Sequence, residues 1–397
     1  MPSFPRRVPP RHEPASSRTN ALQEVPEAMN PTPKPLRRRW TRLAVAGVAL
    51  ICAAGLVVAC GDDDDDAGAG TAADTTATSA PEVGKINDYT LPDVPEPSKP
   101  YKVVLLQAHR SDAFAISAAE AVQEMGKQNG VEVIVNDAGG YQNVPKQIDQ
   151  IEAAILEKPD ALLFWSTDPT AVVPALEKAK AAGIKLVGFV QPPSTDTEFT
   201  VTGDFTLDGE TMARSLFTKM GGEGKAMVIL GGAGSAYQAA LKEGWETALK
   251  DFPDIEVVAD QTVPDFDPSK VQSAVENQLV RNPDLGGVMT TTTAMAASAS
   301  DALAASGRGG SAFAVGQILG DCDQIRLLQE NRLAIVLGVP AVYYGRLAMA
   351  NTISMLEGGS PDKLTVVPGN VYTPANIDDA PLELEIAPQF REGCSVK

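Results

Sequence analysis

Histidine and cysteine are scarce in this chain, and their scarcity excludes most catalytic chemistry. His12 and His109 are the only histidines in 397 residues. His12 lies in an N-terminal stretch that we expect to be removed. A serine–histidine–aspartate triad or a histidine-rich zinc site would therefore depend on His109 alone. The four cysteines include no pattern typical of a metal cluster. The composition predicts a protein that is not an enzyme and that needs no metal or other cofactor.

Positive charge is also in short supply. The chain has 33 Lys and Arg against 51 Asp and Glu, for a formal net charge of −18 at pH 7. Such an excess of negative charge repels phosphate backbones and anionic lipid, so it argues against nucleic acid or a membrane surface as a partner. It favours solubility outside the cell, and the length allows two α/β lobes of ordinary size.

An uncharged apolar run, residues 43–60, follows a basic cluster at 37–42 and ends on Ala59 and Cys60. This arrangement resembles a bacterial lipoprotein signal, in which Cys60 becomes the lipid-bearing first residue of the mature chain. About 18 apolar residues could also form a plain membrane anchor. The small residue before Cys60 and the polar segment after it favour the lipoprotein signal. Both interpretations place the remaining chain outside the cytoplasmic membrane, and the first anchors it by lipid to the outer face of the bacterial cell membrane.

The two segments around this signal have no periodic apolar face. Residues 1–28 are rich in Pro and Arg, so either translation begins at Met29 or these residues form a disordered leader. We assign 1–60 to the leader and signal peptide. Residues 61–100 begin with five consecutive aspartates and end in a Pro-spaced stretch. Few apolar residues and self-repelling charge predict a disordered tether there.

From Tyr101 onward, short apolar runs alternate with amphipathic stretches of helical period. This rhythm is typical of parallel sheets covered by helices, and it runs through two successive halves divided near 201–204. The predicted strands are 102–108, 131–136, 161–165, 185–189, 225–230, 255–259, 287–290, 313–316 and 334–338. The predicted helices are 113–128, 145–158, 170–182, 207–220, 236–250, 268–282, 294–305 and 343–356. Two open sheets of this kind bind a ligand in the cleft where their strand ends meet.

A series of short segments carries a resemblance to a known family through its order and spacing. These segments are 111–114, 158–165, 167–168, 181–187, 202–204, 231–235, 243–245, 265–267, 282–284, 295–296 and 315–316. Over about 101–371 the chain resembles the sugar-type periplasmic binding proteins, the ribose-binding-protein-like receptors of ABC importers. The resemblance implies an α/β fold of type I, with two Rossmann-like lobes whose parallel sheets are joined by a three-strand hinge.

The same resemblance implies how the chain is divided. Crossings between the lobes are expected near Gly203, Val339 and Val366. Lobe one would then comprise 101–203 and 339–365, and lobe two would comprise 204–338 and 366–372. Residues 373–397 form a C-terminal tail. Of the remaining cysteines, Cys322 and Cys394 would either form a disulfide that ties this tail to the body or remain as two free thiols.

The resemblance also implies a ligand site between the lobes. The positions that match it are Ser111, Phe114, Trp165, Gln191, Asp204, Phe266 and Thr292. The chain departs from the family pattern at several pocket positions. Typical members have charged or amide groups where this chain has Ala239, Thr292, Thr293, Ile318 and Gly338, and an Asp-Arg pair where it has Val190 and Gln191. The aromatic positions remain, and their faces can stack on a sugar ring, a planar ring or a cation. We therefore expect a ligand less hydroxylated than a pentose, or one bound through water.

Two enzymatic interpretations compete with ligand binding. The turn at 231–235 precedes a helix and could approach a phosphate, but the third glycine of a dinucleotide loop is missing. Asp204, Asp208, Asp265 and Asp267 could supply paired carboxylates for glycoside hydrolysis. They are better explained as helix caps and hinge residues, so an extracellular hydrolase is a third hypothesis.

The sequence thus predicts a lipid-anchored, monomeric solute-binding protein that captures a small molecule by hinge closure and delivers it to an ABC permease. A sugar or polyol is the favoured ligand, and another organic solute is the alternative. A ligand sensor for a membrane signalling partner is the second functional hypothesis. A cytoplasmic repressor of the same fold is excluded by the signal.

Overall fold

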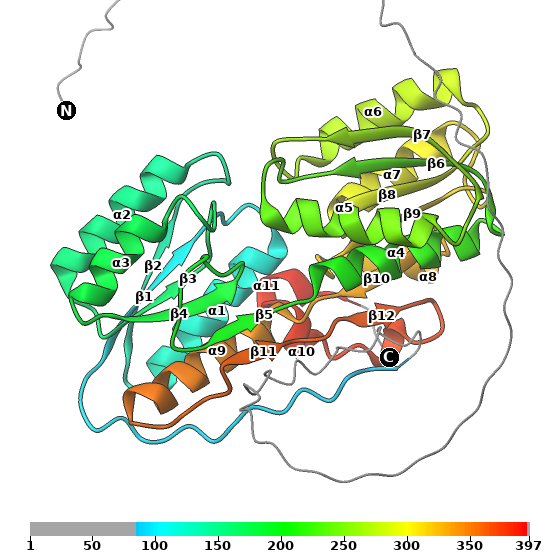
Figure 1. Ribbon diagram of the computed structural model, residues 1–397. Helices are drawn as coiled ribbons and strands as arrows, with labels where there is room; N and C mark the ends of the chain where they lie inside the picture. The colour runs from blue at the N-terminus through cyan, green and yellow to red at the C-terminus, as the bar shows by residue number, and fades with distance from the viewer. Residues whose placement is uncertain (1–84, 395–397) are drawn as a thin grey trace, which may run out of the picture. The chain divides into compact units, whose positions relative to one another are not determined.

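The computed structural model describes residues 85–394, and two six-stranded sheets organise them (Figure 1). We call the part built on each sheet a lobe. The first sheet has the order β11-β5-β4-β3-β1-β2, and all its neighbouring strands are parallel. Its strands are β1 (Lys102–Gln107), β2 (Glu132–Asp137), β3 (Ala161–Phe164), β4 (Lys185–Val190), β5 (Thr200–Thr202) and β11 (Leu364–Val366).

The second sheet has the order β12-β10-β9-β8-β6-β7. It is parallel except where β12 runs antiparallel to β10 at its edge. Its strands are β6 (Glu223–Leu230), β7 (Asp254–Thr262), β8 (Leu285–Thr292), β9 (Phe313–Gln317), β10 (Leu333–Gly338) and β12 (Asn370–Tyr372). The predicted α/β fold with two parallel-dominated lobes is therefore confirmed.

Helices cover both faces of each sheet, and polar caps begin several of them. Asp112 caps α1, Ser235 caps α5 and Asp267 caps α6, each by accepting a hydrogen bond from a backbone amide of the first turn. The first lobe carries α1 (Ala113–Gln128), α2 (Val144–Glu157), α3 (Val173–Ala181) and α9 (Ala341–Leu356). The second carries α4 (Phe205–Lys219), α5 (Ala236–Leu249), α6 (Pro268–Arg281), α7 (Thr293–Ala305) and α8 (Cys322–Gln329).

Burial on both faces of the sheet explains why the strands are continuous apolar runs in the sequence. In β1, Val103 and Leu105 belong to a cluster shared with α1 and α9, whereas Val104 and Leu106 belong to a cluster shared with α2 and α3. All four side chains are at most 1 % exposed. A strand covered on both faces has no polar side, which is the pattern expected of a buried parallel sheet.

The chain passes between the two sheets three times. The first passage joins β5 to α4, the second joins β10 to α9, and the third joins β11 to β12. The connections are only a few residues long, and they bring α9 and β11 back to the first lobe after the second lobe has been built. This three-strand hinge agrees with the fold expected from the resemblance.

Part of the segment expected to be a disordered tether packs on the body instead. The Asn87 backbone N–H donates to Asn370 Oδ1 at 2.8 Å, and the Tyr89 hydroxyl donates to the Pro368 carbonyl. The Tyr89 ring also lies 4.8 Å from the Tyr343 ring. Residues 85–100 form no helix or strand, but the expectation of disorder is wrong for the part that makes these contacts, because its aromatic ring and amide find partners. Residues 61–84 lie outside the described range.

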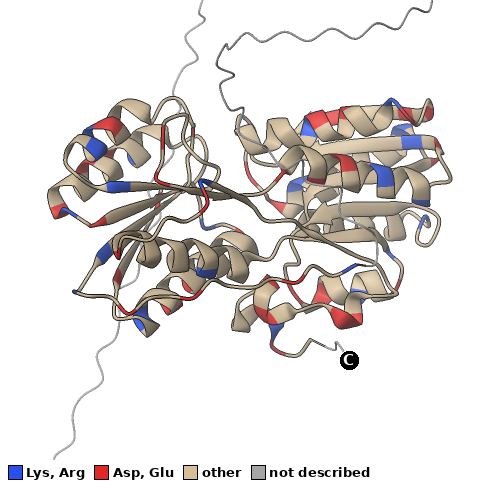
Figure 2. Ribbon diagram, turned by 60° about the horizontal axis from the view of Figure 1, so that its bottom comes forward, with Lys and Arg blue, Asp and Glu red and all other residues tan. Residues whose placement is uncertain are grey.

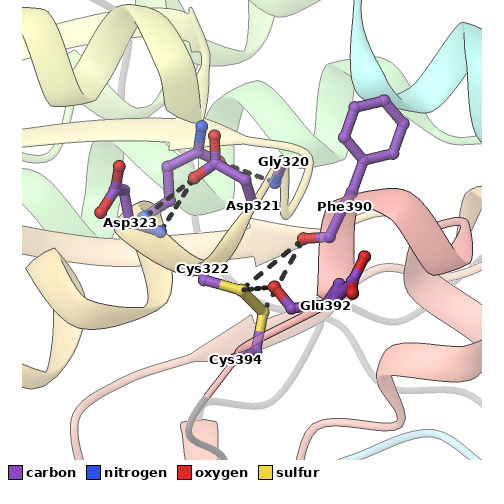
Figure 3. The surroundings of a disulfide bond; sticks show 8 residues. Gly320, Asp321, Cys322, Asp323, Phe390, Glu392 and Cys394 are labelled. Atoms are coloured by element: carbon purple, nitrogen blue, oxygen red, sulfur yellow. Dashed lines mark hydrogen bonds between the residues drawn. A yellow bond between two sulfur atoms is a disulfide. The ribbon is translucent and has the colours of Figure 1, made fainter.

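The C-terminal tail is folded and covalently held. It contains a 3₁₀ turn, η1 (Ile377–Asp379), and two single-turn helices, α10 (Leu382–Glu385) and α11 (Pro388–Arg391). Cys322 at the start of α8 and Cys394 near the end of the tail form a disulfide, shown in Figure 3. Of the alternatives left open by the sequence, the structure contains the bonded pair.

Charged residues of both signs lie on the helices of both lobes (Figure 2). Many are paired, for example Arg214 with Glu210 at 2.7 Å and Lys178 with Glu152 at 2.9 Å. Within residues 85–394, no helix has the length and apolar character needed to cross a bilayer. The signal run, Met29 and Cys60 lie outside the described residues.

Candidate functional site

A cavity lies between the lobes, where loops that follow the strand ends of both sheets meet. It encloses about 380 Å³, part of it open to solvent. Its lining residues are mostly aromatic or aliphatic: His109, Asp112, Phe114, Tyr141, Trp165, Val190, Gln191, Phe205, Tyr237, Phe266, Gln317, Ile318 and Val339. A concave site at the carboxyl ends of parallel strands is the expected ligand position in folds of this kind.

The first lobe supplies a cluster of rings. His109 follows β1, Phe114 lies in the first turn of α1, and Trp165 follows β3. The Trp165 ring stands edge-on to both others, with centroids 4.9 Å from His109 and 5.8 Å from Phe114. The Asp112 side chain accepts a hydrogen bond from the Ala115 amide at 2.8 Å and so begins α1 at the point that brings Phe114 to the cavity.

The second lobe closes the cavity with Phe266, Phe205 and Tyr237. Phe266 precedes α6, and its ring centroid lies 5.1 Å from that of His109 in the other lobe. Phe205 and Tyr237 begin α4 and α5, and their rings meet edge-on at 4.9 Å. Rings from both lobes therefore face one space.

Two glutamines connect the lobes by hydrogen bonds. Gln191 Oε1 in the first lobe accepts from the Tyr237 amide of α5 at 3.0 Å. Gln191 Nε2 donates to the Ser166 carbonyl in its own lobe, so both ends of its amide are used. Gln142 Nε2 donates across the boundary to the Ala233 carbonyl at 3.0 Å. These bonds hold the two walls of the cavity together.

Two β-branched residues in the cavity wall have left-handed backbone conformations. Val190 at the end of β4 has φ 57°, and Ile318 just after β9 has φ 71°. A β-branched residue is an outlier there, at a cost of roughly 1–3 kcal/mol. Strained backbone of this kind concentrates at functional sites, and here it occurs once in each lobe, at the same cavity.

The single histidine of the described chain cannot form a catalytic triad. The Ser111 hydroxyl lies 3.0 Å from His109 Nδ1, and Asp112 Oδ2 lies 3.9 Å from the same nitrogen. A triad needs its serine and its carboxylate on opposite nitrogens of the ring. Burial lowers the pKa of His109 below its usual value of 6.5, against the raising effect of the Asp112 charge, so its ring is neutral at pH 7. These positions suit a wall of a binding site.

Four of the residues predicted for the ligand site line this cavity, namely Phe114, Trp165, Gln191 and Phe266. Ser111 and Thr292 line a neighbouring cavity of about 620 Å³ instead, together with Phe390 of the tail. Thr292 also caps α7 by accepting from the Met295 amide.

Asp204 is absent from both linings. It caps α4 by accepting from the Leu207 amide at 3.0 Å, so it shapes the hinge and is not part of either cavity wall. Of the positions where the chain departs from the family pattern, Val190, Gln191 and Ile318 line the main cavity.

Sequence reasoning missed several lining residues, among them His109, Asp112, Tyr141, Tyr237 and Gln317. His109 and Asp112 flank the predicted Ser111, so their place after the first strand was a signal for them. Tyr141 follows β2 in a turn with no regular spacing from the other rings. Tyr237 comes two residues before Ala239, the position that the family pattern indicated.

Comparison with known proteins agrees with this architecture. Residues 103–360 match the model of the periplasmic binding protein domain. The ribose import binding protein RbsB of Bacillus subtilis is 26 % identical over 69 % of this chain and 88 % of its own length. The D-allose-binding periplasmic protein of Escherichia coli is 26 % identical over 54 % of this chain and 71 % of its own length.

Solved structures show the same fold. The crystal structure of an ABC transporter periplasmic solute-binding protein from Actinobacillus succinogenes, with bound D-allose, superposes with a TM-score of 0.65. It covers 71 % of this chain and all of the solved chain, at 21 % identity. Residues 103–360, which match the family model, include every predicted ligand-site residue. The chain belongs to the periplasmic binding protein family.

Proposed function

We propose that this protein captures a small organic solute between its lobes and delivers it to an ABC permease. The single observation that carries the proposal is the ring-lined cavity whose wall comes from both lobes and is joined by the Gln191–Tyr237 hydrogen bond. A ligand held by two lobes favours the state in which they are close together. Binding therefore drives closure.

The hinge makes such a movement feasible. The three passages between the sheets are short, and a rotation distributed over their backbone angles moves one lobe against the other without unfolding either. The permease would then recognise lobe surfaces that come into register only on closure. A protein that works as a carrier needs no catalytic residue, in agreement with the neutral, enclosed His109.

Sugars and polyols are the first ligand class to test. The relatives named above bind or import ribose and allose, and a pyranose ring presents an apolar face that stacks on Trp165 or Phe266. A less hydroxylated organic solute is the second candidate. It is favoured by the lining, because the charged and amide groups that would pair with several hydroxyls are few in this cavity.

We further propose that Cys60 carries a lipid that holds the protein at the outer face of the cell membrane. The support is the sequence of the signal, since Cys60 precedes the described residues. Growth with radiolabelled palmitate should label the wild-type chain and leave Cys60→Ala unlabelled. Label on the Cys60→Ala protein would contradict the proposal.

Transport and sensing are separated by an uptake experiment. Deletion of the gene should abolish uptake of a labelled solute that binds the purified protein, and the wild-type gene should restore it. Normal uptake after deletion, with loss of a transcriptional response to the same solute, would favour a sensor for a membrane signalling partner. We expect a monomer in both cases, which sedimentation of the purified chain would test.

Binding itself is tested by a thermal-shift screen of the purified full chain with D-ribose, D-allose, xylitol and other solutes. A ligand that binds the folded state raises the melting temperature by an amount that grows with its concentration over its dissociation constant. Trp165→Leu should weaken the response to any such ligand, whereas Trp245→Leu provides a control, because Trp245 packs against Phe217 in the second lobe, away from the cavity.

A further inference from the structure

We propose that the solute captured in this cavity is a small organic amine or quaternary ammonium ion. Its positive charge would lie beside the Asp112 carboxylate, and its apolar body would lie among the rings of His109, Trp165 and Phe266. This inference rests on the proposed function, because it names the ligand class of the same site.

The first argument is charge. Asp112 is the only acidic side chain in the cavity lining, and no Lys or Arg of the described chain is part of that lining. The His109 ring is neutral, because burial lowers its pKa. The walls therefore carry one negative charge with no positive side chain among them. Asp112 is only partly buried, with 14 % of its side chain exposed, so a cationic ligand that covers it would supply the opposite charge that the lining lacks.

The second argument is whether the unpaired hydrogen-bonding groups of the lining donate or accept. Gln191 has both ends of its amide engaged within the protein. Gln317 Nε2 donates to the Tyr237 hydroxyl, but Gln317 Oε1 has no partner among residues 85–394, although the residue is only 2 % exposed. An unpaired buried acceptor of this kind calls for a donor on the ligand.

Asp112 adds a second free acceptor. One of its oxygens caps α1, while Oδ2 faces only His109 Nδ1, at 3.9 Å. Two free acceptors, on Asp112 and Gln317, suit a ligand rich in N–H donors. A sugar presents hydroxyls that each donate and accept, and the two glutamine amides that would donate to them are engaged inside the protein, which leaves Trp165 Nε1 as an unpaired donor of the lining within the described chain.

The third argument is the rings. Phe266 lies 5.1 Å from His109, and Tyr141 lies 6.5 Å from Phe266, so aromatic faces and edges surround the space from several sides. Aromatic faces attract ammonium groups through the negative charge of the ring face, and more strongly when water is excluded. A ring-lined wall with a carboxylate at its edge combines both ways of binding an organic cation.

The experiment compares matched probes on the purified full chain by isothermal titration calorimetry. Benzylamine and choline represent the proposed class. Benzyl alcohol has the ring of benzylamine without its charge, and D-ribose, D-allose and xylitol represent the class of the relatives. We expect at least one amine to bind at least tenfold more tightly than benzyl alcohol and than each of the three sugars and polyols.

The variant Asp112→Asn tests the carboxylate directly. Asparagine also caps helices, so α1 should still begin at the same residue. Loss of a charge-assisted contact is expected to weaken amine binding by roughly 10- to 100-fold. Asp267→Asn is the matched control, because Asp267 also caps a helix, α6, but does not line the cavity. Phe266→Leu should weaken amine binding by roughly 3- to 30-fold.

The outcomes separate the two proposals. Amine binding that is lost in Asp112→Asn and kept in Asp267→Asn supports both. Binding of D-ribose, D-allose or xylitol without any amine overturns the ligand class and leaves the solute receptor standing. Amine binding that is equal in Asp112→Asn and wild type also overturns the inference. Absence of binding by every probe overturns the ligand class, and the thermal-shift screen with further solutes then tests the proposed function separately.

Discussion

Replacement of Glu385 by glutamine is expected to remove part of the pH dependence of stability. Glu385 lies in α10 with no exposed surface. Its Oε1 accepts hydrogen bonds from the Tyr372 hydroxyl and from Asn370 Nδ2 at 3.1 Å, whereas Oε2 has no partner in the described chain. Burial raises the pKa of Glu385 from its usual 4.5 to about 7, although the two hydrogen bonds act to lower it.

The size and sign of the effect follow from this difference. Between pH 4.5 and 7 the folded protein keeps a proton that the unfolded chain has released, so the free energy of unfolding falls as the pH rises through this window. The difference between 4.5 and about 7 corresponds to about 3 kcal/mol. The stabilising contribution is complete below pH 4.5 and is lost above pH 7. Glutamine does not titrate, so the variant should lack this fall.

The assay is urea unfolding at several pH values from 4.5 to 8, followed by tryptophan fluorescence. Trp165 and Trp245 are both 3 % exposed and report on the first and second lobes. The wild type should lose about 3 kcal/mol more than Glu385→Gln across this range. Glu383→Gln, an exposed position in the same short helix, is the control and should follow the wild type. Parallel profiles for wild type and Glu385→Gln would refute the reasoning.

Three further predictions concern the tail, the lobe boundary and the hinge. Reduction of the Cys322–Cys394 disulfide, or Ser at both positions, opens a loop of sequence separation 72 and should lower the free energy of unfolding by about 4 kcal/mol in urea titrations. Gln191→Leu leaves the buried Tyr237 amide without its acceptor, so we expect a loss of about 1–3 kcal/mol and a larger radius of gyration in X-ray scattering. Burial and the neighbouring Asp204 charge raise the pKa of Asp208 from 3.8 to about 8. In the same urea assay, the free energy of unfolding of the wild type should therefore still fall between pH 7 and 8, whereas that of Asp208→Asn should stay constant over this range.

The regular part of the fold could be predicted because its signals are local. Helix α1 occupies 113–128, the range that its apolar period indicated. Strand β10, expected at 334–338, begins one residue earlier. A continuous apolar run reflects burial on two faces, and a 3.6-residue period reflects burial on one face. Both patterns can be recognised without knowledge of the partner element.

The elements that were missed depend on distant partners. Strands β5, β11 and β12 are three residues each and exist because a neighbouring strand accepts their hydrogen bonds. The predicted disorder of 85–100 was wrong in part for the same reason. Asn87 and Tyr89 find partners at 368–370, almost 300 positions along the chain. No window of the sequence contains both sides of such a contact.

The sequence by itself determined the fold class and the two lobes, and its resemblance to a family indicated that Phe114, Trp165 and Phe266 line the cavity between them. Only the tertiary structure decided which polar groups remain available there. It pairs Gln191 across the lobes and leaves Gln317 Oε1 without a partner in the described chain. Local patterns record burial, whereas hydrogen-bond partners are assigned by packing, and the ligand class depends on the groups that packing leaves free.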